Sequence, residues 1–215
     1  MAGVIKVDRV QSDSNLAFNI AGANVAFMDA SALRLVGSSI VANGSTIVSG
    51  SKVSAAGMPT GSVLQTVQVS KTDTWTSSSD TWTNITGLTA TITPSSTSSK
   101  ILVMSSVLVG LNYEYFAFLR LARNGSVVLQ GDAAGSRKQI HGMAYMYNQA
   151  SPSNAFITWP GQAVDSPGTT SSLTYSVQMR IADSRTTYVN RLQRDDNADY
   201  EPRGASTLIL MEIAG

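Results

Sequence analysis

The residues from Lys100 to Leu111, KILVMSSVLVGL, form the most apolar run of the chain. In an extended conformation its aliphatic side chains fall on both sides, with Ile101, Val103, Val107 and Val109 on one and Leu102, Met104 and Leu108 on the other. A strand of this kind is buried on both faces, so we expect it at the centre of a sheet. The β-branched residues and the flanking Gly110 favour a strand over a short buried helix.

The residues that follow this run also have the patterns of strands. Residues 173–182 alternate regularly, which predicts one face in the core and one in water. Residues 206–213 are apolar on both sides and predict a central strand, either within a sheet or against a neighbouring subunit. Asn124-Gly125 predicts a type I′ hairpin turn, and Trp159-Pro160-Gly161 is interpreted as a break between strands. About eight to ten strands with very little helix predict an all-β fold, in which residues 59–215 form an antiparallel β-sandwich of jelly-roll type.

Residues 1–58 have a different pattern, in which short apolar pieces are separated by small turn residues. The apolar positions include Leu16, Phe18, Ile20, Val25, Phe27, Leu33 and Leu35. Strands this short cannot enclose a core within one copy. Three interpretations remain open: a disordered tail, a segment packed on its own C-terminal domain, and strands of several copies that intertwine. We favour the last and predict an attachment and oligomerisation segment, joined to the second domain by the linker at 54–61, SAAGMPTG.

Composition excludes several classes of protein. Only 13% of the residues are charged and the formal net charge is +1, which argues against a nucleic-acid partner. Without cysteine, neither a disulfide nor a thiolate metal site can form. The first fifteen residues have no apolar run typical of a secretory signal, and no segment reaches the ~20 apolar residues of a membrane span. We therefore expect no membrane insertion, and synthesis in the cytoplasm.

No residue pattern indicates an enzyme. His141 is the single histidine and so the only candidate for a catalytic base, but the sequence has no GxSxG motif that would present a nucleophilic serine to it. No phosphate-binding GxxxxGK[ST] motif occurs either. A glycosidase needs two carboxylates across a groove, and the sequence cannot place the available ones, Glu114, Asp132, Asp165 and Asp183. We predict no catalytic residues and no cofactor.

The stretch RDDNADYE resembles the first half of a calcium loop, with oxygen ligands at Asp195, Asn197, Asp199 and Glu201. The pattern fails where the loop requires glycine and a final glutamate, because Tyr200 and Ser206 stand there. Arg191, Arg194 and Arg203 are close enough in sequence to neutralise these carboxylates. We predict a salt-bridged loop and no metal.

Several ordered blocks resemble one known family. They are GMPTGSVLQTVQ, WTNITGLTATITPSSTSSKILVMSSV, FLRLARNGSVVLQGD and NRLQRDDNADYEPRGASTLILMEIAG, which together span about residues 57–215. In these blocks the chain is similar to the C-terminal domain of fibre-type structural proteins of tailed bacteriophages, especially those that infect marine and freshwater bacteria. The N-terminal part departs from the family because it lacks a long shaft of collagen-like or coiled-coil repeats.

The resemblance implies a homotrimeric, non-enzymatic virion protein on the tail or the capsid surface. Its N-terminal segment would dock on other virion proteins, in the tail adaptor or portal region or on the capsid, and its head would contact a glycan or protein of the host cell. Expected contact residues are Trp75, Tyr113, Tyr115, Asn148 and Asn154, from loops 71–80, 113–116 and 148–154, although these aromatic residues can equally pack in the core. A capsid decoration protein and a polysaccharide-degrading tailspike-like enzyme remain alternatives.

Overall fold

The computed structural model describes backbone and side chains for residues 57–111, 116–145, 156–182 and 185–215, and the backbone of six strands between residues 16 and 53. The chain divides into two compact units, Met1–Met58 and Pro59–Gly215. The division lies within the linker at 54–61. Within the described residues, no helix is long and apolar enough to cross a membrane.

The described strands of the first unit form two antiparallel sheets. One consists of β1 (Leu16–Ile20), β2 (Ala23–Met28) and β3 (Leu33–Leu35), and the other of β4 (Ser39–Ala42), β5 (Ser45–Ser49) and β6 (Lys52–Val53). In the first sheet Leu16 pairs with Met28, which in turn pairs with Leu33. The seven apolar residues predicted for attachment and oligomerisation all lie on β1–β3, and their side chains are outside the described part of the structure.

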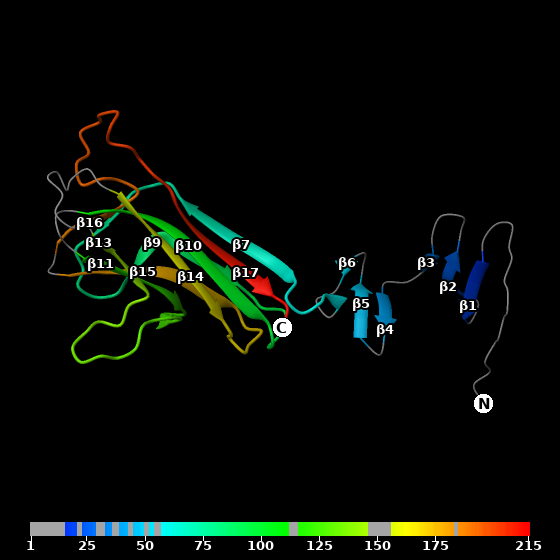
Figure 1. The fold of residues 1–215 in the computed structure, drawn as a ribbon. Coiled ribbons are helices and arrows are strands. Elements are labelled where there is room, and N and C mark those ends of the chain that lie inside the picture. The colour runs from blue at the N-terminus through cyan, green and yellow to red at the C-terminus, as the bar shows by residue number, and fades with distance from the viewer. Residues whose placement is uncertain are drawn as a thin grey trace. The chain divides into compact units, whose positions relative to one another are not determined.

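The second unit consists of two antiparallel sheets that enclose one core (Figure 1). The first sheet has the order β7-β17-β10-β14, and β16 and β8 continue beside one end of β10. Its bounds are β7 (Val63–Lys71), β8 (Trp75–Ser77), β10 (Lys100–Gly110), β14 (Phe156–Asp165), β16 (Thr187–Val189) and β17 (Ser206–Ile213).

The second sheet has the order β9-β15-β11, with β12 and β13 both paired to β11. Its bounds are β9 (Thr83–Ile92), β11 (Phe116–Arg123), β12 (Ser126–Val127), β13 (Gly142–Tyr145) and β15 (Leu173–Ile181). No α-helix occurs in the described residues, so the prediction of an all-β, antiparallel fold is confirmed.

The central position of β10 is confirmed, but the prediction that both its faces are buried is wrong. Ile101, Val103, Val107 and Val109 are fully buried in the core between the sheets. The opposite side chains, Leu102, Met104 and Leu108, are only partly buried. Leu108 packs against Gly204 of the loop before β17, and no other sheet of the described residues covers that side. Strand β17 lies centrally in the sheet, as predicted, and its second face, which contains Ile209 and Met211, is also only partly buried in the single chain.

Strand β15 shows the reverse error, since its polar face was predicted to be wet. Ser176 and Gln178 are buried on that face. Both donate a hydrogen bond to Asn84 Oδ1 on β9, at 3.1 Å from Ser176 Oγ and 2.9 Å from Gln178 Nε2. Polar side chains that bond to one another across strands are shielded from water by their neighbours.

The interpretation of Trp159-Pro160-Gly161 as a break is also wrong, because β14 continues through it to Asp165. Strand β14 pairs only with β10 among the described strands, so it is an edge strand, where proline is tolerated. Trp159 is buried, and a Cβ atom at Gly142 or Gly161 would collide with its indole. These glycines therefore serve close packing of the ring rather than a turn.

The predicted hairpin turn at Asn124-Gly125 agrees with the structure. Asn124 and Gly125 have φ of 48° and 84° between β11 and β12, as a type I′ turn requires. At the same end of the sandwich, the turn at 95–99 is fastened to β17 by Glu212, which is buried on the core side. The carboxylate accepts hydrogen bonds from Ser95 N–H (2.7 Å), Ser95 Oγ (2.6 Å), Ser99 Oγ (2.7 Å) and Gln65 Nε2 (2.6 Å).

Candidate functional site: a cationic pocket on the second sheet

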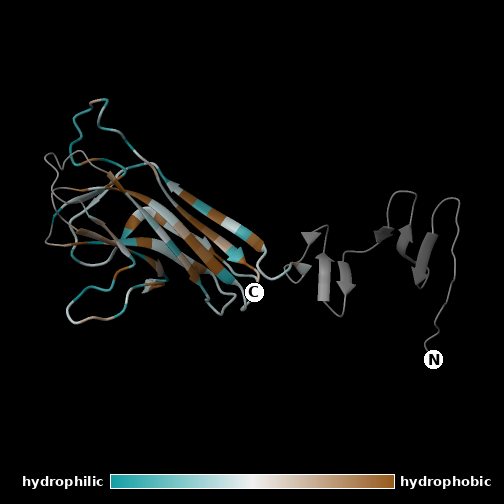
Figure 2. Ribbon diagram, viewed as in Figure 1, coloured by the Kyte–Doolittle hydropathy of each residue, from teal (hydrophilic) through white to brown (hydrophobic). Residues whose placement is uncertain are grey.

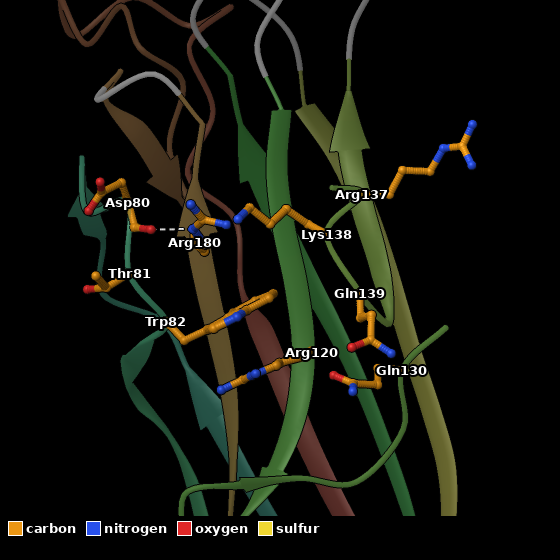
Figure 3. A pocket seen from close by; sticks show the side chains of 9 residues that line it. All are labelled: Asp80, Thr81, Trp82, Arg120, Gln130, Arg137, Lys138, Gln139 and Arg180. Carbon is orange, nitrogen blue, oxygen red and sulfur yellow. Dashed lines mark hydrogen bonds between the residues drawn. The ribbon is translucent and has the colours of Figure 1, made fainter. Parts of the chain in front are cut away.

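An open pocket of about 450 Å³ lies on the outer side of the sheet formed by β9, β15 and β11 (Figure 3). One wall is the segment that leads into β9, and the other is the loop between β12 and β13. The lining residues are Asp80, Thr81, Trp82, Arg120, Gln130, Arg137, Lys138, Gln139 and Arg180. We call this group the cationic pocket, because four of the nine carry a positive charge.

The strand register places two arginines on the floor of the pocket. Arg120 on β11 lies opposite Gln178 on β15, and Phe118 lies opposite Arg180. Alternate residues of a strand point to the same side, so Arg120 and Arg180 share the outer face of the sheet. Their neighbours Leu119 and Ile181 point into the core.

Each of these arginines is held by a neutral acceptor. Arg120 Nε donates to Gln178 Oε1 at 2.8 Å, and its guanidinium carbon lies 4.2 Å from the centre of the Trp82 ring. Burial lowers the pKa of Arg120, although it stays charged at any physiological pH. Arg180 Nε donates to the carbonyl oxygen of Asp80, the bond drawn in Figure 3.

The opposite wall supplies two more cations from adjacent positions. In Figure 3 the Lys138 side chain extends across the pocket toward Arg180, whereas Arg137 points away from it. Both side chains are exposed, and neither forms an ion pair with a described residue. Gln139 on the same wall is fixed by a 2.9 Å bond from its Nε2 to the carbonyl oxygen of Gly131.

Aromatic side chains are stacked on the same outer face, beside Arg180 and toward the start of β11. The Phe116 and Tyr145 rings are 4.5 Å apart and nearly parallel, and Phe118 is 6.0 Å from Phe116. Met143, which pairs with Phe118, is 47% exposed. This face therefore combines guanidinium and ammonium groups with flat apolar surfaces, a combination suited to anionic ligands that have apolar parts.

Two of the side chains considered for catalysis, His141 and Asp165, instead make packing, ion-pair and hydrogen-bond contacts within the fold. His141 packs edge-on against Trp159 at 5.4 Å between ring centres, and burial lowers its pKa, so the ring is neutral near pH 7. Asp165 pairs with Arg123 Nη1 at 2.7 Å and accepts a 2.6 Å hydrogen bond from Tyr175 Oη. Asp132 is exposed, and Glu114 and Asp183 lie outside the described residues.

The loop with calcium-like spacing is salt-bridged, as expected. Arg203 and Arg191 approach Asp195 at 2.7 and 3.6 Å, and Arg194 approaches Asp196 at 2.6 Å. Across the described ranges, no group of three histidine or acidic side chains is arranged to hold a metal ion.

The predicted contact residues do not coincide with the cationic pocket. Trp75 lies on β8 rather than in a loop, where it is partly buried and packs against the core. Lys71, the first residue of the predicted loop 71–80, is instead the last residue of β7 and is buried, with its ammonium nitrogen 2.8 Å from a carboxylate oxygen of Asp73. Tyr113, Tyr115, Asn148 and Asn154 lie outside the described residues.

Sequence reasoning missed the cationic pocket. The outward parity of Arg180 within the regular pattern of 173–182 was a usable signal. Its partners Trp82, Arg120 and Lys138 come from three other stretches of the chain, which only the strand register brings together. No known protein-family model matches this chain, and a search of curated proteins finds no match.

Proposed function

We propose that this chain is a non-enzymatic, fibre-type structural protein of a tailed-bacteriophage particle. In this proposal it is a homotrimer, residues 1–58 anchor it to other virion proteins, and the sandwich of residues 59–215 faces outward to contact the host cell. The blocks that resemble phage fibre proteins span about 57–215, nearly the same range as the second compact unit.

The strand order supports a jelly-roll sandwich, a fold found in viral structural and lectin domains. Its eight main strands, in chain order, are β7, β9, β10, β11, β13, β14, β15 and β17. The first pairs with the last, the second with the seventh, the third with the sixth and the fourth with the fifth. Such nested pairing is what a long hairpin produces when it rolls into two sheets. Fold alone does not fix function, so the proposal depends on the surfaces.

The observation that carries the proposal is an aliphatic, almost uncharged surface on the outer side of the first sheet. We call it the aliphatic face. Its adjacent strands place Leu102 beside Met211 and Met104 beside Ile209, and Val164 and Val63 at its margins are 63% and 50% exposed. The other outward positions are neutral or small, and the one charged residue, Lys100, is at the end of β10.

This face fits further copies of the same chain. Four strands about 4.8 Å apart and about eight residues long present roughly 500 Å² per copy, which a trimer divides between two neighbours, so each pair of copies buries roughly 500 Å² in total. That area is below the ~1,000 Å² of a specific interface, so the N-terminal strands of a trimer would have to add to it. Copies meet there without electrostatic repulsion because the surface carries almost no charge. The contact also removes from water apolar side chains that are exposed in a single chain.

Two measurements on intact material test the proposal. Sedimentation of the purified full chain should give the mass of three chains, and cryo-microscopy of the phage particle should show the chain in a trimeric fibre. A monomer, or absence from the particle, would contradict the proposal. Density at the symmetry axes of the capsid, flush with its surface, would instead identify a decoration protein.

A further inference from the structure

The cationic pocket has an excess of positive charge that no carboxylate of the described residues neutralises. Asp80 is the only acidic residue among its lining, against four basic ones. Arg123, Arg191, Arg194 and Arg203, elsewhere in the same unit, each form an ion pair with a carboxylate. Arg120 and Arg180 instead bond to neutral oxygens, so their positive charge remains available to a ligand.

The positions of these charges are fixed where they lie on the strands. Arg120 is clamped between the Trp82 ring and the Gln178 amide, and Arg180 is held to the backbone at Asp80. Rigid placement reduces the entropy lost when a ligand binds. Of the five N–H donors of a guanidinium, each of these bonds uses one, and the planar fork suits a carboxylate or a sulfate.

We infer that the cationic pocket binds a negatively charged sugar unit of a surface polysaccharide, held by its carboxylate or sulfate group. This inference rests on the proposed function, since it names the part of the host surface that the head would contact. A volume of about 450 Å³ suits a ligand of one or two sugar rings, and the open mouth lets a polymer continue on both sides. Thr81, Gln130 and Gln139 supply neutral groups for sugar hydroxyls.

Nucleic acid fits the pocket less well. A phosphate backbone needs a track of cations that follows many successive phosphates, whereas the positive charge here is confined to one pocket and the whole chain has a net charge of +1. The sugar and the nucleic acid would also differ in salt dependence, because an extended contact releases more counterions.

The test is a calorimetric titration of the full-length chain with trigalacturonate, a sulfated heparin tetrasaccharide, the methyl ester of trigalacturonate and a single-stranded oligonucleotide. At least one anionic sugar should bind, and the two distinguish carboxylate from sulfate as the recognised group. The neutral ester should bind at least ~10-fold more weakly than its acid. The inference is overturned if neither anionic sugar binds, if trigalacturonate is the sugar that binds and its ester binds equally well, or if the oligonucleotide binds more tightly.

Variants locate the site. Lys138→Gln, which removes an exposed side chain that forms no ion pair with the described residues, should weaken binding of the anionic sugar about 5- to 10-fold. Lys100→Gln, at the edge of the aliphatic face and outside the cationic pocket, should change it by less than about 2-fold. Equal effects of the two changes would show general attraction rather than a site. A chain that is present in the fibre but binds no anionic sugar would sink this inference and leave the proposed function intact.

Discussion

The two outer faces of the sandwich are built on the same core but have opposite chemistry. The aliphatic face has Leu102, Met104, Ile209 and Met211 at its centre, whereas the outer side of the other sheet has Arg120 and Arg180. Figure 2 shows apolar residues along β7, β10 and β17, and on β7 two of them, Val67 and Val69, pack against the core. Both sheets contribute apolar residues to the same core, so the contrast between the two faces lies in the outward positions of their strands.

The difference suggests that one face serves association of copies and the other serves ligand binding. Burial of aliphatic surface is favourable wherever water is excluded, so the aliphatic face suits permanent contact with further copies. Charged groups keep their hydration until a partner of opposite charge replaces it, so the cationic pocket suits reversible, salt-sensitive binding. One sandwich would thus assemble on one side and recognise on the other.

The largest expected effect comes from a charge placed at the centre of the aliphatic face. Ile209→Asp would leave an unpaired carboxylate in each contact between copies, at a cost of about 4 kcal/mol, which weakens association ~1,000-fold. Sedimentation should then show monomers at concentrations where the unmodified chain is trimeric. Thr89→Asp, an exposed position of β9 on the opposite sheet, is the matched control and should stay trimeric.

Ile209→Asp also lowers strand propensity, so its thermal unfolding is measured in parallel. Ile209→Thr keeps a β-branched side chain without adding a charge, and should associate more weakly than the unmodified chain but remain folded. If Ile209→Asp and Thr89→Asp were equally trimeric, the distinction between the two faces would be lost.

The next largest effect is a loss of stability on changing Glu212, which should affect both faces because they share one core. Glu212→Ala leaves the donors of Ser95, Ser99 and Gln65 without their acceptor, which should lower the free energy of unfolding by about 3 kcal/mol. Because both faces depend on one core, chemical denaturation should remove association and sugar binding in the same transition. Two separate transitions would show that the faces are independent.

The same residue gives a pH dependence. Burial opposes ionisation of Glu212, but the hydrogen bonds from Ser95, Gln65 and Ser99 outweigh it and lower the pKa. The carboxylate therefore stabilises the fold above the unfolded-chain pKa of about 4.3, and this contribution is lost as the pH falls through the lower folded value. Urea denaturation below about pH 4 should show this loss in the unmodified chain, and a smaller one in Glu212→Gln.

A smaller effect separates the faces by salt. Raising the ionic strength from about 0.05 M to about 0.5 M should weaken binding of an anionic sugar ~10-fold, because the charges of the cationic pocket are screened. Association through the aliphatic face should be unchanged or slightly stronger. Calorimetry and sedimentation on one sample measure the two. Trimers that dissociate in high salt would assign the contact between copies to charged groups.

The smallest effect is that of the Trp82 ring. Trp82→Ala removes the surface on which Arg120 lies, 4.2 Å from the ring centre, and should cost about 1 kcal/mol of stability and ~3-fold in sugar affinity. Trp82→Phe keeps a ring and should retain most of both. Trimer mass should be unaffected by either change, and a loss of mass would mean that this side also contacts other copies.

Local patterns predicted the strands well because they depend on neighbouring residues. The positions of β10, β15 and β17, and the turn at Asn124-Gly125, all follow from alternation and turn chemistry. The errors concern burial, because whether a side chain is buried depends on which part of the fold lies against that face of its strand. Leu102 is as apolar as Val103, and the sequence alone cannot show that only one of them faces the second sheet.

The cationic pocket could not be predicted for the same reason. Trp82 and Lys138 are far apart in the sequence, and they meet because β9, β15 and β11 pair in one particular register. Polar outward positions such as Arg120 look like ordinary solvent-facing residues until their neighbours across the sheet are known. Pro160 led to the wrong prediction of a break between strands. The strand continues through it because a proline is tolerated on an edge strand such as β14.

The most direct test of the two-faced account uses the absence of cysteine, which allows a single spin label to be placed at will. Met211→Cys labels the aliphatic face and Thr89→Cys labels the outer side of the other sheet. If copies meet through the aliphatic face, labels at position 211 should be immobilised and within about 20 Å of one another, and labels at position 89 should be mobile and farther apart. Mobile, widely separated labels at position 211 would contradict the account.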